Sequence, residues 1–167
     1  MNSFVIIDVQ GFKNIRNNFI LKEISILYQN NEYQTFIIKP PYDFCTLYAN
    51  EQRQIKCMEK HQHGLGWNDG SVTYDSVRKF IQDNISLRTF IYVKGDKKKK
   101  WIKEFLGTKH FIINIKDLGC DSLKELKYQY PNQPRCLTHE KMCTLENVFL
   151  MKCFLQCDED EETPWVF

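Results

Sequence analysis

The chain has 167 residues, of which 43% are hydrophobic and 14% aromatic, and this composition predicts one globular domain rather than a disordered chain. No apolar run approaches the roughly 18 residues needed to cross a membrane, and the N-terminus lacks the basic start and apolar block of a signal peptide. We therefore expect an intracellular protein, cytoplasmic or nuclear. In that compartment its seven cysteines are thiols or metal ligands rather than disulfides.

The net charge of +2 is unevenly distributed along the chain. Five consecutive acids, Asp158 to Glu162, lie in the last ten residues, so the rest of the chain is more basic than the total suggests. We interpret residues 158–167 as an acidic tail that follows a domain over residues 1–157. The tail is expected to be a solvated terminus; alternatively, it competes with nucleic acid for a basic surface or binds a partner.

Apolar patterning predicts strands and helices in a definite order along the chain. Three strands come first and are expected to form an antiparallel meander, and an irregular stretch over residues 42–70 separates them from the remaining elements. The predicted strands cover residues 3–9, 17–29, 33–40, 88–95 and 109–115. One predicted helix begins at Tyr74, and three more cover residues 97–107, 121–126 and 144–155. This order predicts an α/β domain with a mixed five-stranded sheet flanked by helices.

Several short motifs occur in a recognisable sequence. The first strand ends in "DVQGF" with Asp8 and Gln10, "HGLGW" with His63 follows the meander, and "YVKGDKKKKWIKEFL" and "TLENV" come later. In this order the motifs resemble those of the ribonuclease H-like fold, in its DEDD exonuclease branch, and the layout is most similar to the Maelstrom domain. The resemblance covers nearly all of residues 3–156 and implies a ribonuclease H-like sheet.

The same resemblance implies four catalytic carboxylates, of which only Asp8 is present. The other three positions hold Gln10, Ile102 and Asn147. Two-metal cleavage needs several carboxylates around two cations about 4 Å apart, and neutral amide oxygens are poor partners for hard dications. Glu146 is one helical step from Asn147 and should point elsewhere. We therefore expect no conventional two-metal nuclease site, and no catalytic residues.

The segment "CLTHEKMC" places Cys136, His139 and Cys143 within eight residues. Thiolates and imidazole at these spacings can share one tetrahedral zinc, although ordinary buried thiols and a surface histidine are the alternative. For the fourth ligand we favour Cys120, at the head of the preceding helix, where the helix dipole favours the thiolate. The Maelstrom domain holds its zinc with Glu, Cys, His and Cys, and this resemblance implies Glu23 as the alternative fourth ligand.

The segment "KGDKKKKW" contains Lys94, Lys97, Lys98, Lys99 and Lys100 beside an aromatic residue. Dense positive patches bind phosphate backbones by releasing counterions, so these lysines are the predicted nucleic-acid contact; a solvated helix face is the alternative. Trp67 could stack on a base, or it could pack beneath its own loop.

Two functions are consistent with these features. The first is a catalytically inactive, zinc-stabilised exonuclease-like module that binds nucleic acid, RNA rather than DNA, or a protein of an RNA pathway. The second follows from the Maelstrom resemblance, because single-strand ribonuclease activity has been attributed to that family. In that case the protein is a ribonuclease with a different site, and Asp8, His63 and the lysines are the residues to suspect.

Overall fold

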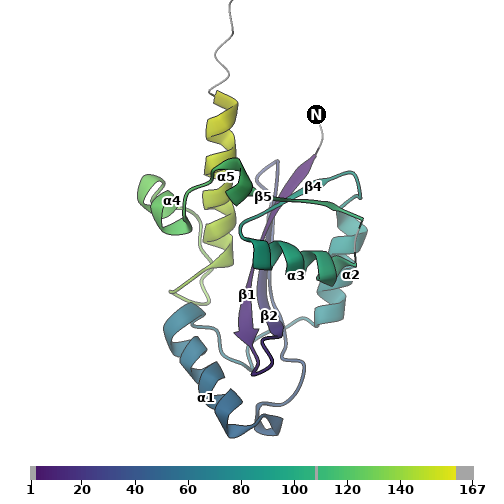
Figure 1. Ribbon diagram of the computed structural model, residues 1–167, viewed down its shortest axis with the longest axis vertical. Coiled ribbons are helices and arrows are strands. Elements are labelled where there is room, and N and C mark those ends of the chain that lie inside the picture. Colours follow the sequence, from purple (N-terminus) through teal and green to yellow (C-terminus); the bar gives the residue numbers. More distant parts are fainter. Residues whose placement is uncertain (1–2, 108, 161–167) are drawn as a thin grey trace, which may run out of the picture.

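A five-stranded mixed sheet forms the centre of the protein (Figure 1), whose computed structural model describes residues 3–107 and 109–160. The strand order is β3-β2-β1-β4-β5; β1, β2 and β3 form an antiparallel meander, and β4 and β5 run parallel to β1. The strands are β1 Phe4–Lys13, β2 Phe19–Tyr28, β3 Tyr33–Ile37, β4 Phe90–Val93 and β5 Phe111–Asn114. The predicted α/β class and mixed five-stranded sheet are therefore confirmed.

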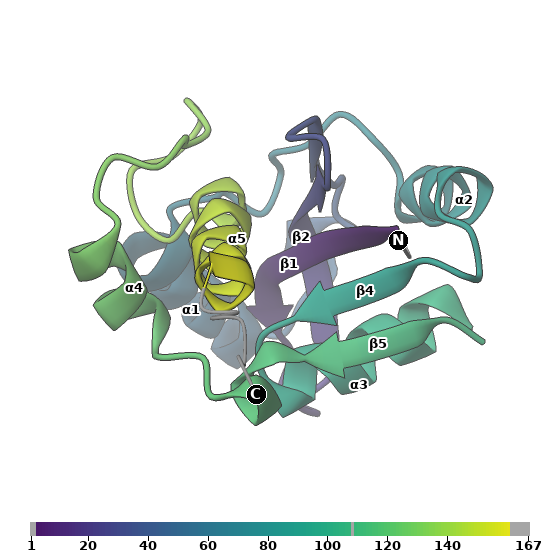
Figure 2. The same ribbon diagram turned by 90° about the horizontal axis from the view of Figure 1, so that it is seen from above.

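Helices cover both faces of this sheet (Figures 1 and 2). The helices are α1 Ala49–Met58, α2 Tyr74–Asn84, α3 Asp96–Leu106, α4 Leu123–Gln129 and α5 Thr144–Asp160. One hydrophobic core joins β1 to α2 and α3 through Val5, Ile7 and Val9, whereas a second core on the opposite face joins Ile6 to α4 and α5. The alternation along β1 thus assigns successive side chains to different helix layers.

Residues 42–70 were expected to be irregular, and that expectation is wrong. They contain the helix α1 and a π-helical turn, Glu59–His63. Within α1, the buried residues are Glu51 and Ile55, so the segment carries no helical repeat of apolar residues that could have revealed it. At the other end of the chain, α5 continues to Asp160 and includes the first residues of the predicted acidic tail, while residues 161–167 lie outside the described part.

An irregularity in the pairing of β1 with β2 follows Gln10 and explains the glycine in "DVQGF". The register shifts between Gln10 and Gly11, and a Cβ atom on Gly11 would lie 1.9 Å from the carbonyl oxygen of Ile20. Only glycine permits this close approach of the two backbones. Up to the shift, Gln10 lies directly opposite Glu23, so the two side chains share one face of the sheet.

Lys22, beside this irregularity, is a buried cation that holds a loop to the sheet. Its side chain is fully buried, and its Nζ donates to the carbonyl oxygens of Ile38 at 3.0 Å and Trp67 at 2.6 Å, and also to that of Asp69. Burial lowers the pKa of Lys22 to about 8, against the attraction of Asp69 and Glu59.

This shift predicts a specific dependence of stability on pH. Between pH 8 and 10.5 the unfolded chain keeps the Lys22 proton that the folded protein has released, so the free energy of unfolding should rise with pH in this window. Below pH 8 both states hold this proton, so the contribution should level off at its lowest value. Urea unfolding of the wild type and of Lys22→Met across this range checks the effect, because the other titrating groups cancel in the difference. Parallel curves for the two proteins would contradict the shift.

Candidate metal centre

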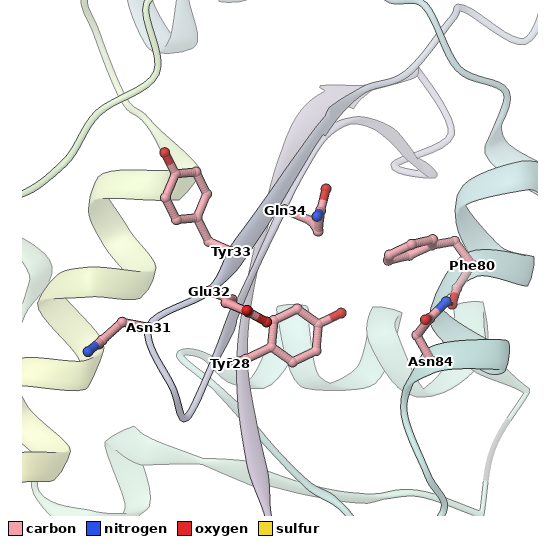
Figure 3. A pocket seen from close by; sticks show the side chains of 7 residues that line it. All are labelled: Tyr28, Asn31, Glu32, Tyr33, Gln34, Phe80 and Asn84. Carbon is pink, nitrogen blue, oxygen red and sulfur yellow. The ribbon is translucent and has the colours of Figure 1, made fainter.

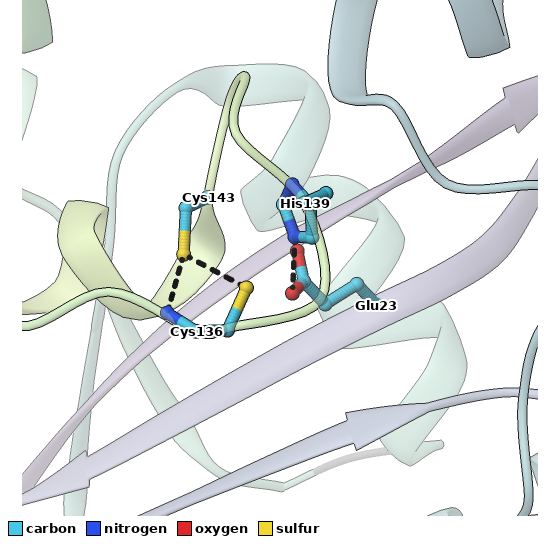
Figure 4. A group of neighbouring side chains, drawn as sticks. All are labelled: Glu23, Cys136, His139 and Cys143. Atoms are coloured by element: carbon cyan, nitrogen blue, oxygen red, sulfur yellow. Dashed lines mark hydrogen bonds and ion pairs between the residues drawn. The ribbon is translucent and has the colours of Figure 1, made fainter.

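Three side chains from the loop between α4 and α5 meet one side chain from the middle of β2 (Figure 4). Glu23, Cys136, His139 and Cys143 each offer one ligand atom, and these atoms all lie within 4.8 Å of one another. The Sγ atoms of Cys136 and Cys143 are 3.4 Å apart, and Nε2 of His139 lies 2.9 Å from Oε1 of Glu23. Two thiols, an imidazole and a carboxylate at this spacing are a ligand set that can hold a metal ion.

The structure brings together three of the four predicted ligands, and its fourth member is Glu23 instead of Cys120. Cys120 is buried in the core between the sheet, α4 and α5, and its thiol faces the carbonyl oxygen of Asp121 at 3.5 Å. Glu23, which is fully buried on β2, reaches the loop between α4 and α5 directly. The preference for Cys120 over Glu23 is therefore corrected.

The environment of the Cys143 thiol acts on its protonation in two opposite directions. Burial raises the pKa of the Cys143 thiol to about 11, although backbone N–H groups of Cys136, at 3.3 Å, and Glu146 favour its thiolate. A neutral thiol is a poor ligand, so a metal ion must displace the proton. Metal binding here should accordingly weaken as the pH falls.

Arg135 organises the loop that carries these ligands. Its guanidinium donates to the carbonyl oxygens of Glu140 and Lys141, both at 2.6 Å, and pairs with the buried carboxylate of Glu146 at 2.5 Å. Lys127 of α4 also pairs with Glu146, at 3.0 Å. Glu146 therefore points away from Asp8, as expected, and fixes the loop to the first turn of α5.

Three of the four positions predicted to be degenerate catalytic residues, Asp8, Gln10 and Asn147, lie beside this centre, on the face of β1 that α5 covers. Asn147 donates to Oδ2 of Asp8 at 2.8 Å, so these two positions are direct neighbours. Ile102 is buried in the opposite core with α2 and α3. Lys98 forms an ion pair with Oδ1 of Asp8, whose side chain is 1% exposed. Both carboxylate oxygens of Asp8 are thus engaged with protein partners.

The lysines of the predicted nucleic-acid surface differ in their surroundings. Lys98 was predicted to contact phosphate, but its side chain is 30% exposed and turns toward Asp8. Lys94 donates to the carbonyl oxygen of Cys120 at 3.0 Å. Lys97 and Lys100 are exposed and Lys99 is half-buried, so these three keep the character expected of a phosphate-binding surface.

The "HGLGW" loop packs inward and serves the fold. His63 is buried, and its ring packs edge-on against that of Phe12 with the ring centroids 4.8 Å apart. Its Nδ1 accepts a hydrogen bond from the N–H of Leu65. Burial lowers the pKa of His63. Trp67 is 3% exposed and donates through Nε1 to the carbonyl oxygen of Tyr42 at 3.1 Å, so it packs beneath its loop and offers no face to a base.

A pocket of about 640 Å³ lies at the opposite end of the β2–β3 pair from Glu23 (Figure 3). It is lined by Tyr28, Asn31, Glu32, Tyr33, Gln34, Phe80 and Asn84. The charged residue of this set is an acid, Glu32, and Tyr33 turns toward Phe149 of α5 rather than into the gap. The lining therefore does not suit a phosphate group.

Comparison with known proteins adds no assignment to this geometry: the sequence matches no protein-family model and no curated protein. Within the described residues, no helix has both the length and the apolar character needed to cross a membrane. Gln10 was predicted only as a degenerate catalytic position, and two other polar side chains near the centre, those of Ser25 and Thr144, were not predicted at all. All three are buried between β1, β2 and α5. A signal was present, because Ser25 and Glu23 alternate with Ile24 and Ile26 on β2.

Proposed function

We propose that the chain is a catalytically inactive, ribonuclease H-like module that is stabilised by one zinc ion and binds nucleic acid, RNA in preference to DNA. The observation that carries the metal is the group formed by Glu23, Cys136, His139 and Cys143, within 4.8 Å of one another. Thiolate and imidazole ligands favour zinc over the hard cations, which prefer oxygen alone. Three of these four side chains are fully or nearly fully buried in the folded domain.

The strand order and the position of Asp8 support the ribonuclease H-like part of the proposal. Three antiparallel strands are followed by two strands parallel to the first, and Asp8 on β1 meets Asn147 on α5. The absence of nuclease activity is inferred from the side chains at the four degenerate positions. Asp8 is the single carboxylate at the four degenerate positions, and the ammonium of Lys98 occupies one of its oxygens. A divalent cation bound there would have to displace that lysine and would find the neutral amide of Asn147 where a second carboxylate is needed.

The nucleic-acid part rests on the exposed lysines at the first turns of α3. Lys97 and Lys100 have no role in the core, and they lie on the same short helix as Lys98, close to the paired Asp8. A phosphate backbone lying across this turn would gain affinity from counterion release at each lysine. A protein of an RNA pathway that carries an acidic surface could use the same charges.

We expect the double variant Lys97→Glu/Lys100→Glu to weaken binding to single-stranded RNA for all sequences alike. The slope of log affinity against log salt should flatten by about one unit for each phosphate contact that is lost. Gel shifts at several salt concentrations measure both effects. The control variant Lys13→Glu/Lys60→Glu makes the same charge change at exposed positions away from α3. It should bind RNA more tightly than Lys97→Glu/Lys100→Glu does.

Two outcomes would overturn the proposal. Equal losses in the two double variants would show attraction to net charge instead of a site on α3. Digestion of RNA or DNA by the wild type with magnesium or manganese, abolished by Asp8→Asn, would show an active nuclease and refute the inactive assignment.

A further inference from the structure

The two oxygens of Glu23 have different surroundings. Oε1 faces Nε2 of His139 at 2.9 Å, on the side where the cysteine thiols lie. Oε2 accepts hydrogen bonds from the side-chain amide of Gln10 and from the backbone N–H of Thr144, the latter at 3.3 Å. One oxygen is therefore directed at the candidate metal centre and the other at protein donors.

We propose that Gln10 is a positioning residue that restricts Glu23 to a single ligand oxygen, Oε1, in the metal centre. The inference rests on the proposed zinc site. Gln10 does not itself touch the metal; it acts on the carboxylate. The position that would carry a second catalytic acid in a DEDD exonuclease thus serves a different centre in this chain.

The orientation of the Gln10 amide is fixed by its two partners. Nε2 donates to Oε2 of Glu23 and to the carbonyl oxygen of Met142 at 2.9 Å, and both partners can only accept. The nitrogen must therefore face them, because the reversed amide would place oxygen against oxygen. Gln10 is 8% exposed, and within the described residues its Oε1 has no hydrogen-bond partner, so its NH2 group alone determines its orientation.

These contacts join the two halves of the centre. Gln10 lies opposite Glu23 across the β1–β2 ladder, and Met142 directly precedes the ligand Cys143. One side chain therefore connects the ligand on the strand with the loop that carries the other ligands. Hydrogen bonds of this kind orient metal ligands and set their basicity.

The chemical consequence concerns coordination number. A free carboxylate can bind a metal ion through one oxygen or through both. With Oε2 held by two donors, Glu23 supplies one oxygen, and the set becomes two thiolates, one imidazole and one carboxylate oxygen. That is a closed four-coordinate site, the form typical of structural zinc.

Replacing zinc by cobalt(II) tests the inference, because four-coordinate cobalt absorbs visible light more strongly than five-coordinate cobalt. In the wild-type protein we expect an intense spectrum of the four-coordinate type. In Gln10→Leu, Oε2 keeps only the long hydrogen bond from the N–H of Thr144 and can turn to the metal, so the absorption should weaken toward the five-coordinate type. The affinity for zinc, measured by competition with a chromophoric chelator, should fall about tenfold.

Asn147→Leu is the matched control, because it also replaces a buried amide on this face by leucine, but its partner is Asp8 rather than Glu23. It should keep the wild-type spectrum. Gln10→Glu provides a second, isosteric variant should Gln10→Leu fail to fold, and its added carboxylate should also weaken the absorption. A wild-type protein that binds neither cobalt nor zinc would refute the metal centre itself. Metal-bound Gln10 variants with the spectrum and affinity of Asn147→Leu would refute the role of Gln10 alone.

Discussion

Protein purified without added metal should contain one zinc ion per chain, and its removal should lower the free energy of unfolding by about 3 kcal/mol or more. The reason is that the ligands are brought together by the folded chain and are separated when it unfolds. Binding energy at Glu23, Cys136, His139 and Cys143 is therefore folding energy. Elemental analysis gives the metal content, and urea unfolding with and without a chelator gives the stability.

Two cysteine variants make this test specific. Cys136→Ser should be as unstable without chelator as the wild type is with it, and chelator should change it little further. Cys45→Ser, an exposed cysteine outside the group, should behave like the wild type. Absence of stoichiometric metal, together with an unchanged Tm in Cys136→Ser, would eliminate the centre.

Reversing the charge of Lys98 should be the most damaging change in the lysine-rich segment. Lys98→Glu would place a carboxylate beside Asp8, which is 1% exposed and would lose its ion-pair partner. Breaking a buried pair in this way typically costs about 3–5 kcal/mol, and the partial exposure of Lys98 places the expected loss toward the lower end. Lys97→Glu, one residue away and exposed, should change the stability by about 0.5 kcal/mol or less.

A double-mutant cycle separates the ion pair from other effects of the substitution. Asp8→Asn removes the buried charge, so Lys98→Glu should be far less harmful in that background than in the wild type. Urea unfolding of the four proteins measures the coupling. If Lys98→Glu and Lys97→Glu were equally mild, the pair between Lys98 and Asp8 would be absent in solution.

The sequence was informative where apolar residues follow a simple period. The meander, the strands β4 and β5 and the helices α2, α3 and α5 were predicted near their observed positions, because each buries one face or both in a regular pattern. Helix α1 was missed because its exposed surface is polar and its apolar contacts with the core are made by Ile55 and the partly buried Met58. Local patterning cannot reveal a helix that contributes so little to the core.

The candidate metal ligands show the same division between what local sequence patterns reveal and what they do not. Cys136, His139 and Cys143 could be found because a loop brings residues that are near in sequence near in space. The fourth ligand depends on which strand passes that loop, and spacing along the chain gives no information on that point. Cys120 was preferred for its thiol and its helix position, whereas the register of β2 places Glu23 opposite Gln10, at the loop. The ion pair of Lys98 with Asp8 was missed for a related reason, since a basic run does not reveal which of its members turns inward.

The contact of Glu23 with the segment 136–143 also has a topological meaning. It joins an early strand to a loop near the C-terminus, so an ion bound there would be a cross-link that encloses most of the polypeptide in one ring. Closing a ring of that size restricts the unfolded ensemble more than closing a short one, although the gain grows only slowly with length. The strands β1 and β2 and the helix α5 would then unfold as a single cooperative unit. The segments enclosed by the ring could unfold locally without detaching α5 from the sheet.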